Sequence, residues 1–519
     1  MYTSYVYVGV VGNDKQTSSK SKLLGKIKMR KVIDVQMQLG EIQISRINID
    51  IKSRDEIPKV LLGLQHVYCN LVTREEVFSV LERIIPDGTS MKTGRPGMDL
   101  WRVLVLGTVR LSCNWDFDKL REIANNHRTL RQMLRHGLRE KNYSYSLQTL
   151  KDNLSLFEQE HLDEINQVVV KAGHKALGMK GKWELRCQCD SFVGETDVHF
   201  PTDINLLLDA IFKVIILITR ESKAAGVLGW GKSVSNLLKI KSHYRYLQKL
   251  KKSTSKNEEK KQAREDLILK TYQEYIEMVQ LYLRRASETM VELLGKGESN
   301  IVRLLEIERF MLDGNKLIDQ IERRVFKGET IPHAEKVFSL FERHTEWICK
   351  GKAGVRQELG VRISVLKDQH GFILYHHVME NQTDDKVAVL MVEEAKRRFP
   401  GLTSCSFDKG YYSPSNKEKL STLVPEVYLP KKGKLSQSEK EVEGSEDFVL
   451  ARRKHSSVES SINGLEHCGL DRCLDHGIKG FKRYAALSVL ARNIQTLGNI
   501  IQAKQLKSLK RKEKQRQAA

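Results

Sequence analysis

The chain has 519 residues, a formal net charge of +22 and a sequence pI near 9.5. This length allows several domains around a sizeable core, and this charge favours nucleic acid as a partner over a membrane surface. The most apolar run, Ala210–Thr219, is too short to span a bilayer and contains Lys213. Because there is no secretory signal and the eight cysteines are scattered, we expect a cytoplasmic, nucleoid-associated protein with free thiols.

The first 175 residues divide into two expected parts. Residues 1–60 form an N-terminal extension without an assigned role, in which Val6–Val11 is a candidate strand. Residues 61–175 are expected to be an all-helical DNA-binding domain, because apolar residues recur at helical spacing in short segments from Thr73 onward. A helical bundle without DNA contacts is the alternative. The arginines expected to meet phosphates are Arg95, Arg102, Arg110, Arg121, Arg128, Arg131 and Arg135.

Strand patterns then predict a catalytic domain in two parts, residues 176–208 and residues 346–500, separated by a helical insertion at 209–345. The first part contains a strand from Trp183 to Phe192. The second part contains strands at Gly360–Leu366, Gly371–His377 and Leu402–Phe407, and an amphipathic helix at Val387–Arg398. Together these elements predict a mixed α/β sheet.

The C-terminal quarter is expected to return to helix. Residues 431–446 are polar and predict a mobile loop, and a helix is expected from about Lys454. The apolar segment Phe481–Ile501 should pack against the core. The basic tail, residues 501–519, is predicted to be disordered and to bind polyanions.

Three separated carboxylates are the candidate catalytic residues and metal ligands. Asp190 is placed near the end of the first strand, Asp408 directly follows the strand at 402–407, and Glu459 lies on a helix. Carboxylates and substrate phosphates are the usual ligands of Mg²⁺, and two ions can activate the attacking oxygen and stabilise the leaving one. Each acid also has an ordinary explanation. An Asp after a strand is often a turn residue, and Ser456-Ser457-Val458-Glu459 fits a helix capping box.

Two other motifs need an interpretation. Residues 226–233, Gly-Val-Leu-Gly-Trp-Gly-Lys-Ser, match the P-loop pattern. A P-loop follows a strand directly, whereas helix-forming residues precede Gly226, so we predict a turn between two helices with Lys232 on the DNA side. His467, Cys468, Cys473 and His476 invite a zinc hypothesis, but they contain no C-x-x-C pair, and ordinary packing is favoured.

From about Val72 to Gly498 the chain resembles a DDE transposase of a bacterial insertion sequence, of the loosely classified ISNCY-like group. Each matching motif is only moderately specific, but all four occur in the expected order. They are Thr93-Gly94-Arg95-Pro96-Gly97 with Trp101–Leu111, Asp190-Ser191 through His199–Asp203, Phe407-Asp408-Lys409-Gly410-Tyr411, and His455–Asn463 with Glu459 inside it.

The resemblance implies an α/β protein with an RNase H-like mixed-sheet catalytic core, a long helical insertion and a preceding all-helical DNA-binding region. It also implies two Mg²⁺ or Mn²⁺ ions per site, held by Asp190, Asp408 and Glu459. The expected reaction is hydrolysis at transposon ends, followed by attack of the freed 3′-OH on target DNA. The expected partners are double-stranded terminal inverted repeats, target DNA and further copies of the chain, in a homodimer or larger assembly.

We further predict DNA contacts by the basic residues near these motifs, with His455 either contacting DNA or orienting Glu459. The candidates are Arg95, Arg102, Lys409, Arg452, Arg453, Lys454 and His455. Two rival hypotheses remain, namely a structure-specific nuclease on the same fold and a catalytically inactive DNA-binding protein derived from a transposase.

Overall fold

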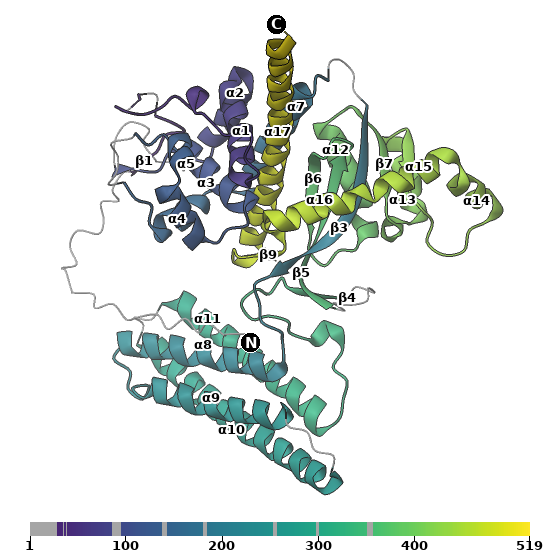
Figure 1. The fold of residues 1–519 in the computed structure, drawn as a ribbon. Coiled ribbons are helices and arrows are strands. Elements are labelled where there is room, and N and C mark those ends of the chain that lie inside the picture. The colour runs from purple at the N-terminus through teal and green to yellow at the C-terminus, as the bar shows by residue number, and fades with distance from the viewer. Residues whose placement is uncertain are drawn as a thin grey trace.

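A computed structural model of the chain describes residues 28–34, 36–37, 39–85, 95–137, 143–179, 184–252, 257–296, 300–349 and 357–518 (Figure 1). The candidate strand Val6–Val11 lies outside these ranges. Among the described residues, no helix is both long enough and apolar enough to cross a bilayer. The structure is a mixed α/β fold in which helices outnumber strands.

The N-terminal region is mainly helical. A short parallel pair, β1 (Lys28–Met29) and β2 (Arg95–Pro96), accompanies the single-turn η1 (Ile44–Arg46) and seven α-helices within the described residues. These helices are α1 (Glu56–Cys69), α2 (Leu71–Glu82), α3 (Leu100–Ser112), α4 (Phe117–Asn126), α5 (Arg128–Met133), α6 (Leu147–Leu154) and α7 (Gln159–Ala176). The predicted helix start at Thr73 was wrong by two residues, because Asn70 caps α2 by accepting a hydrogen bond from the Thr73 backbone N–H.

A seven-stranded sheet is built from the two parts of the chain that flank the insertion. Strand β3 (Leu185–Thr196) pairs antiparallel with β5 (Gln357–Asp368), and β5 pairs antiparallel with β4 (Glu346–Cys349) and β6 (Ile373–Met379). On the other edge of β3, β7 (Leu402–Phe407), β8 (Glu426–Tyr428) and β9 (Arg472–Cys473) complete the sheet. β7 and β9 are parallel to β3, and β8 is parallel to β7. The predicted strands at 360–366, 371–377 and 402–407 are therefore confirmed as β5, β6 and β7.

Helices cover both faces of this sheet. α12 (Asp384–Arg398) packs on β5 and β6, near η4 (Lys409–Tyr411), and α13 (Pro414–Leu423) links β7 to β8. The other face receives α15 (Glu446–His455) and α16 (Ser457–Leu465), and Figure 1 shows α16 crossing β3. The short polar helix α14 (Gln437–Gly444) precedes α15 and α16 in the chain.

The C-terminal helix α17 (Gly477–Ala518) joins the N-terminal helices to the sheet, after the short η5 (Glu466–Leu470). It packs against α1, α3 and α7. The Asn493 side chain donates to the Ile373 carbonyl at 2.8 Å and to Asn166 of α7 at 2.7 Å, and it accepts from the Ile373 backbone N–H at 2.9 Å. One continuous apolar core consequently includes the N-terminal helices, the sheet and α17.

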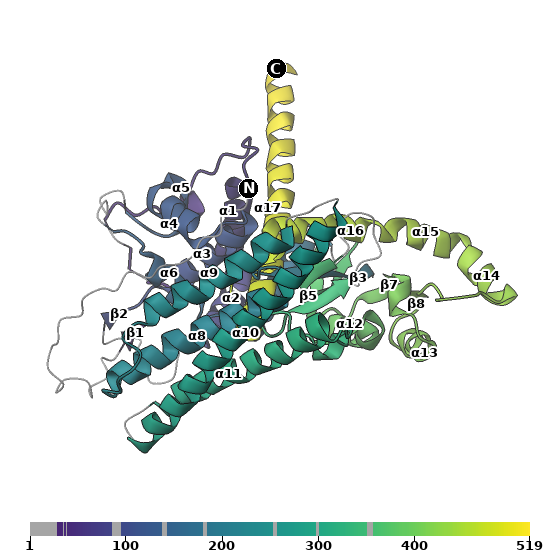
Figure 2. The same cartoon turned by 90° about the horizontal axis from the view of Figure 1, so that it is seen from below.

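The insertion forms a separate helical bundle with its own apolar core. Its helices are α8 (Asp203–Ala224), α9 (Ser233–Lys252), α10 (Glu258–Gly295) and α11 (Ile301–Ile321), followed by η2 (Glu322–Phe326) and η3 (His333–Glu335). The bundle lies beneath the sheet in Figure 1, and Figure 2 shows its four helices side by side. The chain leaves and re-enters the sheet at one place, where the Thr196 and Thr345 hydroxyls are 2.8 Å apart.

Three predictions about the C-terminal quarter were wrong. The polar segment expected to be a loop contains α14, because Ser436 and Glu439 form a capping box. The helix expected from Lys454 begins earlier, at Glu446. The tail expected to be disordered continues α17 to Ala518, since no helix-breaking residue interrupts it after Gly498.

Candidate acidic site

The sheet has a gap along one edge of β3, and this gap positions two of the predicted acids. β7 pairs with β3 only as far as Phe407, opposite Cys189, and β9 resumes the pairing at Glu195. Asp190 is the first β3 residue beyond the end of β7, and Asp408 is the first residue after β7. The parallel register therefore places the two acids next to each other. The prediction that Asp190 ends its strand was wrong, because β3 continues to Thr196 and it is the neighbouring strand that stops.

Glu459 reaches the same region from α16. The predicted capping box is absent, since Ser456 is helical and its hydroxyl donates to the Arg453 carbonyl at 2.8 Å. The side chains of Glu459 and Asp408 are exposed, and neither makes a hydrogen bond or ion pair with any described residue. Neither carboxylate is therefore occupied by the ordinary structural role that its sequence position suggested.

The electrostatics of Asp190 link these acids. The pKa of Asp190 is raised to about 6, first by burial and then by the negative charges of Asp408, Asp384 and Glu459, while a hydrogen bond from the Ser191 backbone N–H opposes this rise. A charge influences a pKa in this way only when it is near, so the three predicted acids share one electric field. No basic side chain is among the main influences on this pKa.

Asp384 is a fourth acid that the sequence analysis did not identify. It lies in the first turn of α12, where its carboxylate accepts a hydrogen bond from the Ser191 hydroxyl at 2.6 Å. A Cβ atom on Gly410 would lie 2.8 Å from the same carboxylate, so glycine lets the Asp408 loop approach α12 closely. The sequence offered only Thr383-Asp384-Asp385, which is an ordinary acidic helix start.

A polar row fixes the junction between α15 and α16 on the sheet. Lys367, Gln188 and Ser406 lie opposite one another on β5, β3 and β7 and share one face. The Lys367 ammonium donates to the Ser457 hydroxyl at 2.8 Å, and Ser406 is hydrogen-bonded to His455 Nδ1 at 3.0 Å. These two contacts hold the start of α16, and with it Glu459, above the sheet.

The position of His455 clarifies its predicted role. Burial lowers the pKa of His455, although Asp408 and Glu459 oppose this effect, so the imidazole is neutral near pH 7. Its ring is held by Ser406 and is not directed at solvent. Of the two predicted roles, orienting the Glu459 helix fits this geometry better than holding a phosphate.

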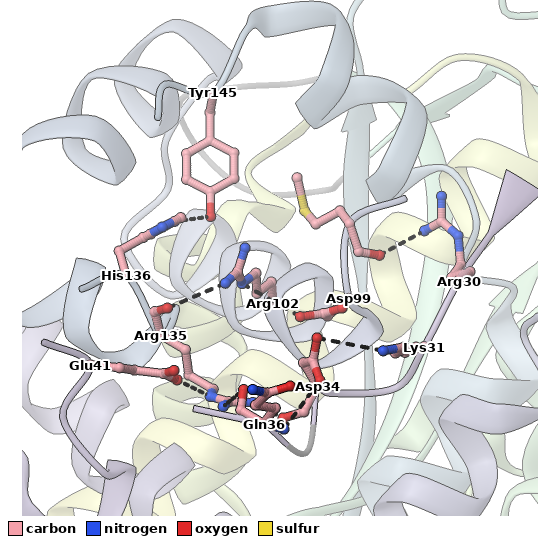
Figure 3. A network of polar contacts seen from close by, with 11 residues as sticks. Arg30, Lys31, Asp34, Gln36, Glu41, Asp99, Arg102, Arg135, His136 and Tyr145 are labelled. Carbon is pink, nitrogen blue, oxygen red and sulfur yellow. Dashed lines mark hydrogen bonds and ion pairs between the residues drawn. The ribbon is translucent and has the colours of Figure 1, made fainter. Parts of the chain in front are cut away.

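Several arginines expected to contact phosphates are used inside the fold. Arg102 donates to the Arg135 carbonyl at 3.3 Å and lies 3.7 Å from Asp99 (Figure 3). Arg135 is buried and pairs with Glu41 and with the Asp34 carbonyl. These contacts attach residues 30–41 to the helical region, and they leave Arg102 and Arg135 little freedom to bind DNA.

Arg110 likewise does not match the prediction. It is buried, lies 3.4 Å from Asp475, and stacks over Phe117 at 3.9 Å from the ring centroid. By contrast, Lys409, Arg452, Arg453 and Lys454 are exposed beside the acids and remain candidates for phosphate contacts. The Arg95 side chain lies outside the described residues.

The two competing motifs have structural explanations. Residues 226–232 form a turn between α8 and α9, as predicted, and Trp230 is buried there with its indole N–H donating to Thr289 at 3.0 Å. A helix precedes this turn where a P-loop needs a strand. His476 is hydrogen-bonded to Glu342 at 2.8 Å, and Cys468 and Cys473 are buried thiols, which ordinary packing accounts for.

The acids suit hard divalent cations in chemistry, but they are not gathered into a coordination shell. Carboxylate oxygens are the ligands that Mg²⁺ and Mn²⁺ prefer. Within the described ranges, no three His, Cys, Asp or Glu side chains are close enough to hold an ion. Comparison with protein-family models, with curated proteins and with solved structures finds no match to this chain.

Proposed function

We propose that this protein is a DNA transposase of the DDE type, with Asp190, Asp408 and Glu459 as its catalytic carboxylates. The observation that carries the proposal is the β3–β7 register, which sets the buried Asp190 beside Asp408 where β7 ends. The raised pKa of Asp190, which arises from burial and from neighbouring acids, supports it. Acids left in this state destabilise a fold unless an external cation neutralises them. A divalent metal ion is such a cation, and DNA phosphates are its natural additional ligands.

The sheet supports an RNase H-like core. Its order is β4-β5-β3-β7-β8, with β6 also paired to β5 and β9 also paired to β3. β5 is antiparallel to β3, β4 and β6, β7 is parallel to β3, and β8 is parallel to β7. This is the arrangement expected of an RNase H-like sheet. Asp190 and Asp408 then lie at the edge where β7 ends, and Glu459 comes from α16, which covers one face of the sheet. Each of the three acids therefore comes from a different sequence motif and a different structural element.

Each side chain has a proposed role in the reaction. Asp190 on β3, Asp408 directly after β7 and Glu459 on α16 would hold the metal ions. Bound there, Mg²⁺ or Mn²⁺ supplies activation of the attacking oxygen and stabilises the leaving oxygen. Lys409 and Arg452 are placed to neutralise phosphates, and Lys367 and Ser406 hold the Glu459 helix in position.

The reaction then has two phosphoryl transfers. In the first, water adds to phosphorus at a transposon end and the bond to the 3′ oxygen breaks, which leaves a 3′-OH and a 5′-phosphate. In the second, that 3′-OH attacks a phosphorus of target DNA, and the target's own 3′ oxygen leaves. Two ends must react together, so we expect a homodimer or larger assembly on DNA.

The test compares Asp408→Asn with Asp447→Asn, which removes an exposed carboxylate from α15 instead. Cleavage of DNA carrying the element's own ends is measured with Mg²⁺ and with Mn²⁺. Asp408→Asn should lose at least about 10³-fold in rate, because metal-centred stabilisation of several kcal/mol is lost, while Asp447→Asn should cut like the wild type. Equal rates for Asp408→Asn and the wild type would refute the proposed site.

Strand transfer separates the proposal from the nuclease hypothesis. A pre-cleaved end with a free 3′-OH is incubated with plasmid target, and joined products are counted. The transposase should form them, and a structure-specific nuclease should not. A DNA-binding protein without catalytic activity would bind these ends with equal affinity whether residue 190 is Asp or Asn, and would cut nothing.

A further inference from the structure

Helix α9 differs in charge from the rest of the bundle. Its 20 residues include six lysines and arginines and no acid. The neighbouring α10 has eight acids and six bases, and α11 has four acids and three bases. Positive charge is therefore concentrated on one helix of the insertion, although the bundle as a whole does not require it for packing.

The basic residues of α9 lie on its outer face. Ile240 and Leu247 are buried in the bundle core, while Lys239, Arg245 and Lys249 are exposed. At about 1.5 Å per residue, these three cations extend along about 15 Å of helix. None of the three makes an ion pair with any acid in the part of the chain that the structure describes, so their charge faces solvent.

From this placement we propose that the outer face of α9 is a docking surface for duplex DNA. A duplex presents about one phosphate charge for each 1.7 Å of its length, so a 15 Å row of cations faces several phosphates at once. Tyr246 is exposed between Arg245 and Lys249 and adds a hydroxyl group that can donate to a phosphate oxygen. No base-reading is implied, and the contact would position DNA without selecting its sequence.

The helix is poorly suited to a lipid surface. A membrane-bound amphipathic helix buries its apolar side among the acyl chains. The apolar side of α9 is already occupied, because Tyr244, Ile240 and Leu247 belong to the bundle core or pack against it. The face that remains carries the three cations together with the exposed side chains of Val234 and Leu238. Two apolar side chains are too few to hold a helix among acyl chains, so this face suits a polyanion in water.

This inference rests on the proposed function only for its choice of DNA as the polyanion, and it does not depend on the metal site. It gives the insertion a role that the acidic site cannot supply, which is to hold DNA at a distance from the reacting phosphodiester. The bundle connects to the sheet near the Thr196–Thr345 contact, so a duplex held on α9 would be attached to the body through this one stem.

The experiment uses the full-length protein and compares two triple variants. One is Lys239→Gln, Arg245→Gln and Lys249→Gln on α9. The matched control is Lys260→Gln, Lys270→Gln and Arg284→Gln, which removes the same charge from exposed positions of the acid-rich α10. Binding to a fluorescent duplex of about 40 base pairs, or about four helical turns, is measured in EDTA at several salt concentrations.

The α9 variant should bind at least about tenfold more weakly near 0.1 M salt, and its slope of log affinity against log salt should fall by about 2.7. The α10 variant should change affinity by less than about twofold. An equal loss in both variants would mean that only total charge matters, and would overturn the proposal. A loss of binding to anionic phosphatidylserine vesicles, with DNA affinity kept, would also overturn it in favour of a membrane surface.

A further measurement separates this inference from the proposed reaction. Cleavage by the wild type in Mg²⁺ is measured beside duplex binding in EDTA, and the binding is compared with and without the α9 substitutions, which should weaken it. If cleavage fails but this difference persists, the docking surface stands without the transposase mechanism. If cleavage succeeds and the difference is absent, the docking surface is wrong and the mechanism stands.

Discussion

The helices around the two apolar cores of this protein are packed in different ways. In the main core, α1 and α17 cross with their backbones in contact: a Cβ on Gly498 would lie 1.8 Å from the Lys59 carbonyl oxygen, and one on Gly63 would lie 2.2 Å from that of Ile494. In the bundle, the nearest atoms to a Cβ on Gly314 would be side-chain atoms, those of Leu283 at 3.4 Å and of Ala210 at 3.9 Å. The main core therefore depends on close contacts between residues far apart in sequence, whereas the bundle depends on ordinary side-chain packing.

This difference matters for function because the acidic site belongs to the first kind of core. The register of β3 with β7 and the crossing of α16 bring Asp190, Asp408 and Glu459 together, and α17 connects that sheet to the N-terminal helices. Changes within the bundle should leave the positions of these three acids unchanged, since the bundle is connected to the sheet near the Thr196–Thr345 contact. Stability changes in the two cores should therefore have different consequences.

The largest expected effect comes from Gly498→Ala. The added methyl group collides with backbone, which cannot move as a flexible side chain can, so α1 and α17 must separate along their contact. We expect a loss of about 3 kcal/mol in the free energy of unfolding. Urea denaturation followed by circular dichroism measures it, and a loss below about 1 kcal/mol would show that the crossing is looser than described.

A smaller effect is expected when α16 loses its attachment to the sheet. Ser457→Ala removes the partner of the Lys367 ammonium, a hydrogen bond to a charged group worth about 1.5–3 kcal/mol. Because Glu459 follows on the same helix, cleavage should slow by about tenfold while DNA affinity is kept. The exposed neighbour Ser460→Ala is the control. A loss of DNA affinity with unchanged cleavage rate would contradict a positioning role.

The acidic site should also show a pH-dependent stability. The folded protein holds the Asp190 proton up to about pH 6, whereas the unfolded chain releases it near the ordinary pKa of 3.8. The folded state binds more protons between these values, so wild-type stability falls as pH rises through this window and stays lower above it. Asp190→Asn cannot ionise, and it should stabilise the metal-free protein.

The gain from Asp190→Asn should be on the order of 1 kcal/mol at pH 7, after allowance for partial solvent screening, and it should vanish below about pH 3.8. Thermal unfolding in EDTA at both pH values measures the difference. A gain of equal size at low pH would mean that shape, not charge, is responsible. Adding Mg²⁺ should raise the stability of the wild type alone, because only the carboxylate binds the ion.

The sequence predicted the local elements well where a pattern is local. The strand at 402–407 and the helices of the insertion follow from alternation and from 3–4 spacing. Helix α1 was not predicted, although Pro58 is acceptable in the first turn of a helix. Gly63 weakens the helical pattern. A glycine is needed there because Ile494, more than 400 residues away in the chain, approaches closely.

The candidate site was predictable only in part for the same reason. Asp190, Asp408 and Glu459 could be selected as acids following strand and helix signals. Asp384 could not, because its role depends on the contact with Ser191 and on the approach of Gly410. Arg110 and Arg135 could not be distinguished from surface arginines, since burial is set by partners such as Asp475 and Glu41 that are distant in sequence.

The smallest expected effect has the opposite sign and completes the comparison of the two cores. Gly314→Ala places the same methyl group within a helix of the bundle, where its nearest neighbours are side-chain atoms of Leu283 at ordinary contact distance. Alanine is favoured over glycine inside a helix by about 0.8–1 kcal/mol, so the bundle should become more stable by roughly 0.5–1 kcal/mol. Differential scanning calorimetry detects this as a small rise in the transition of the bundle. A destabilisation as large as that of Gly498→Ala would mean that both cores are closed by backbone contact, and the distinction between them would fail.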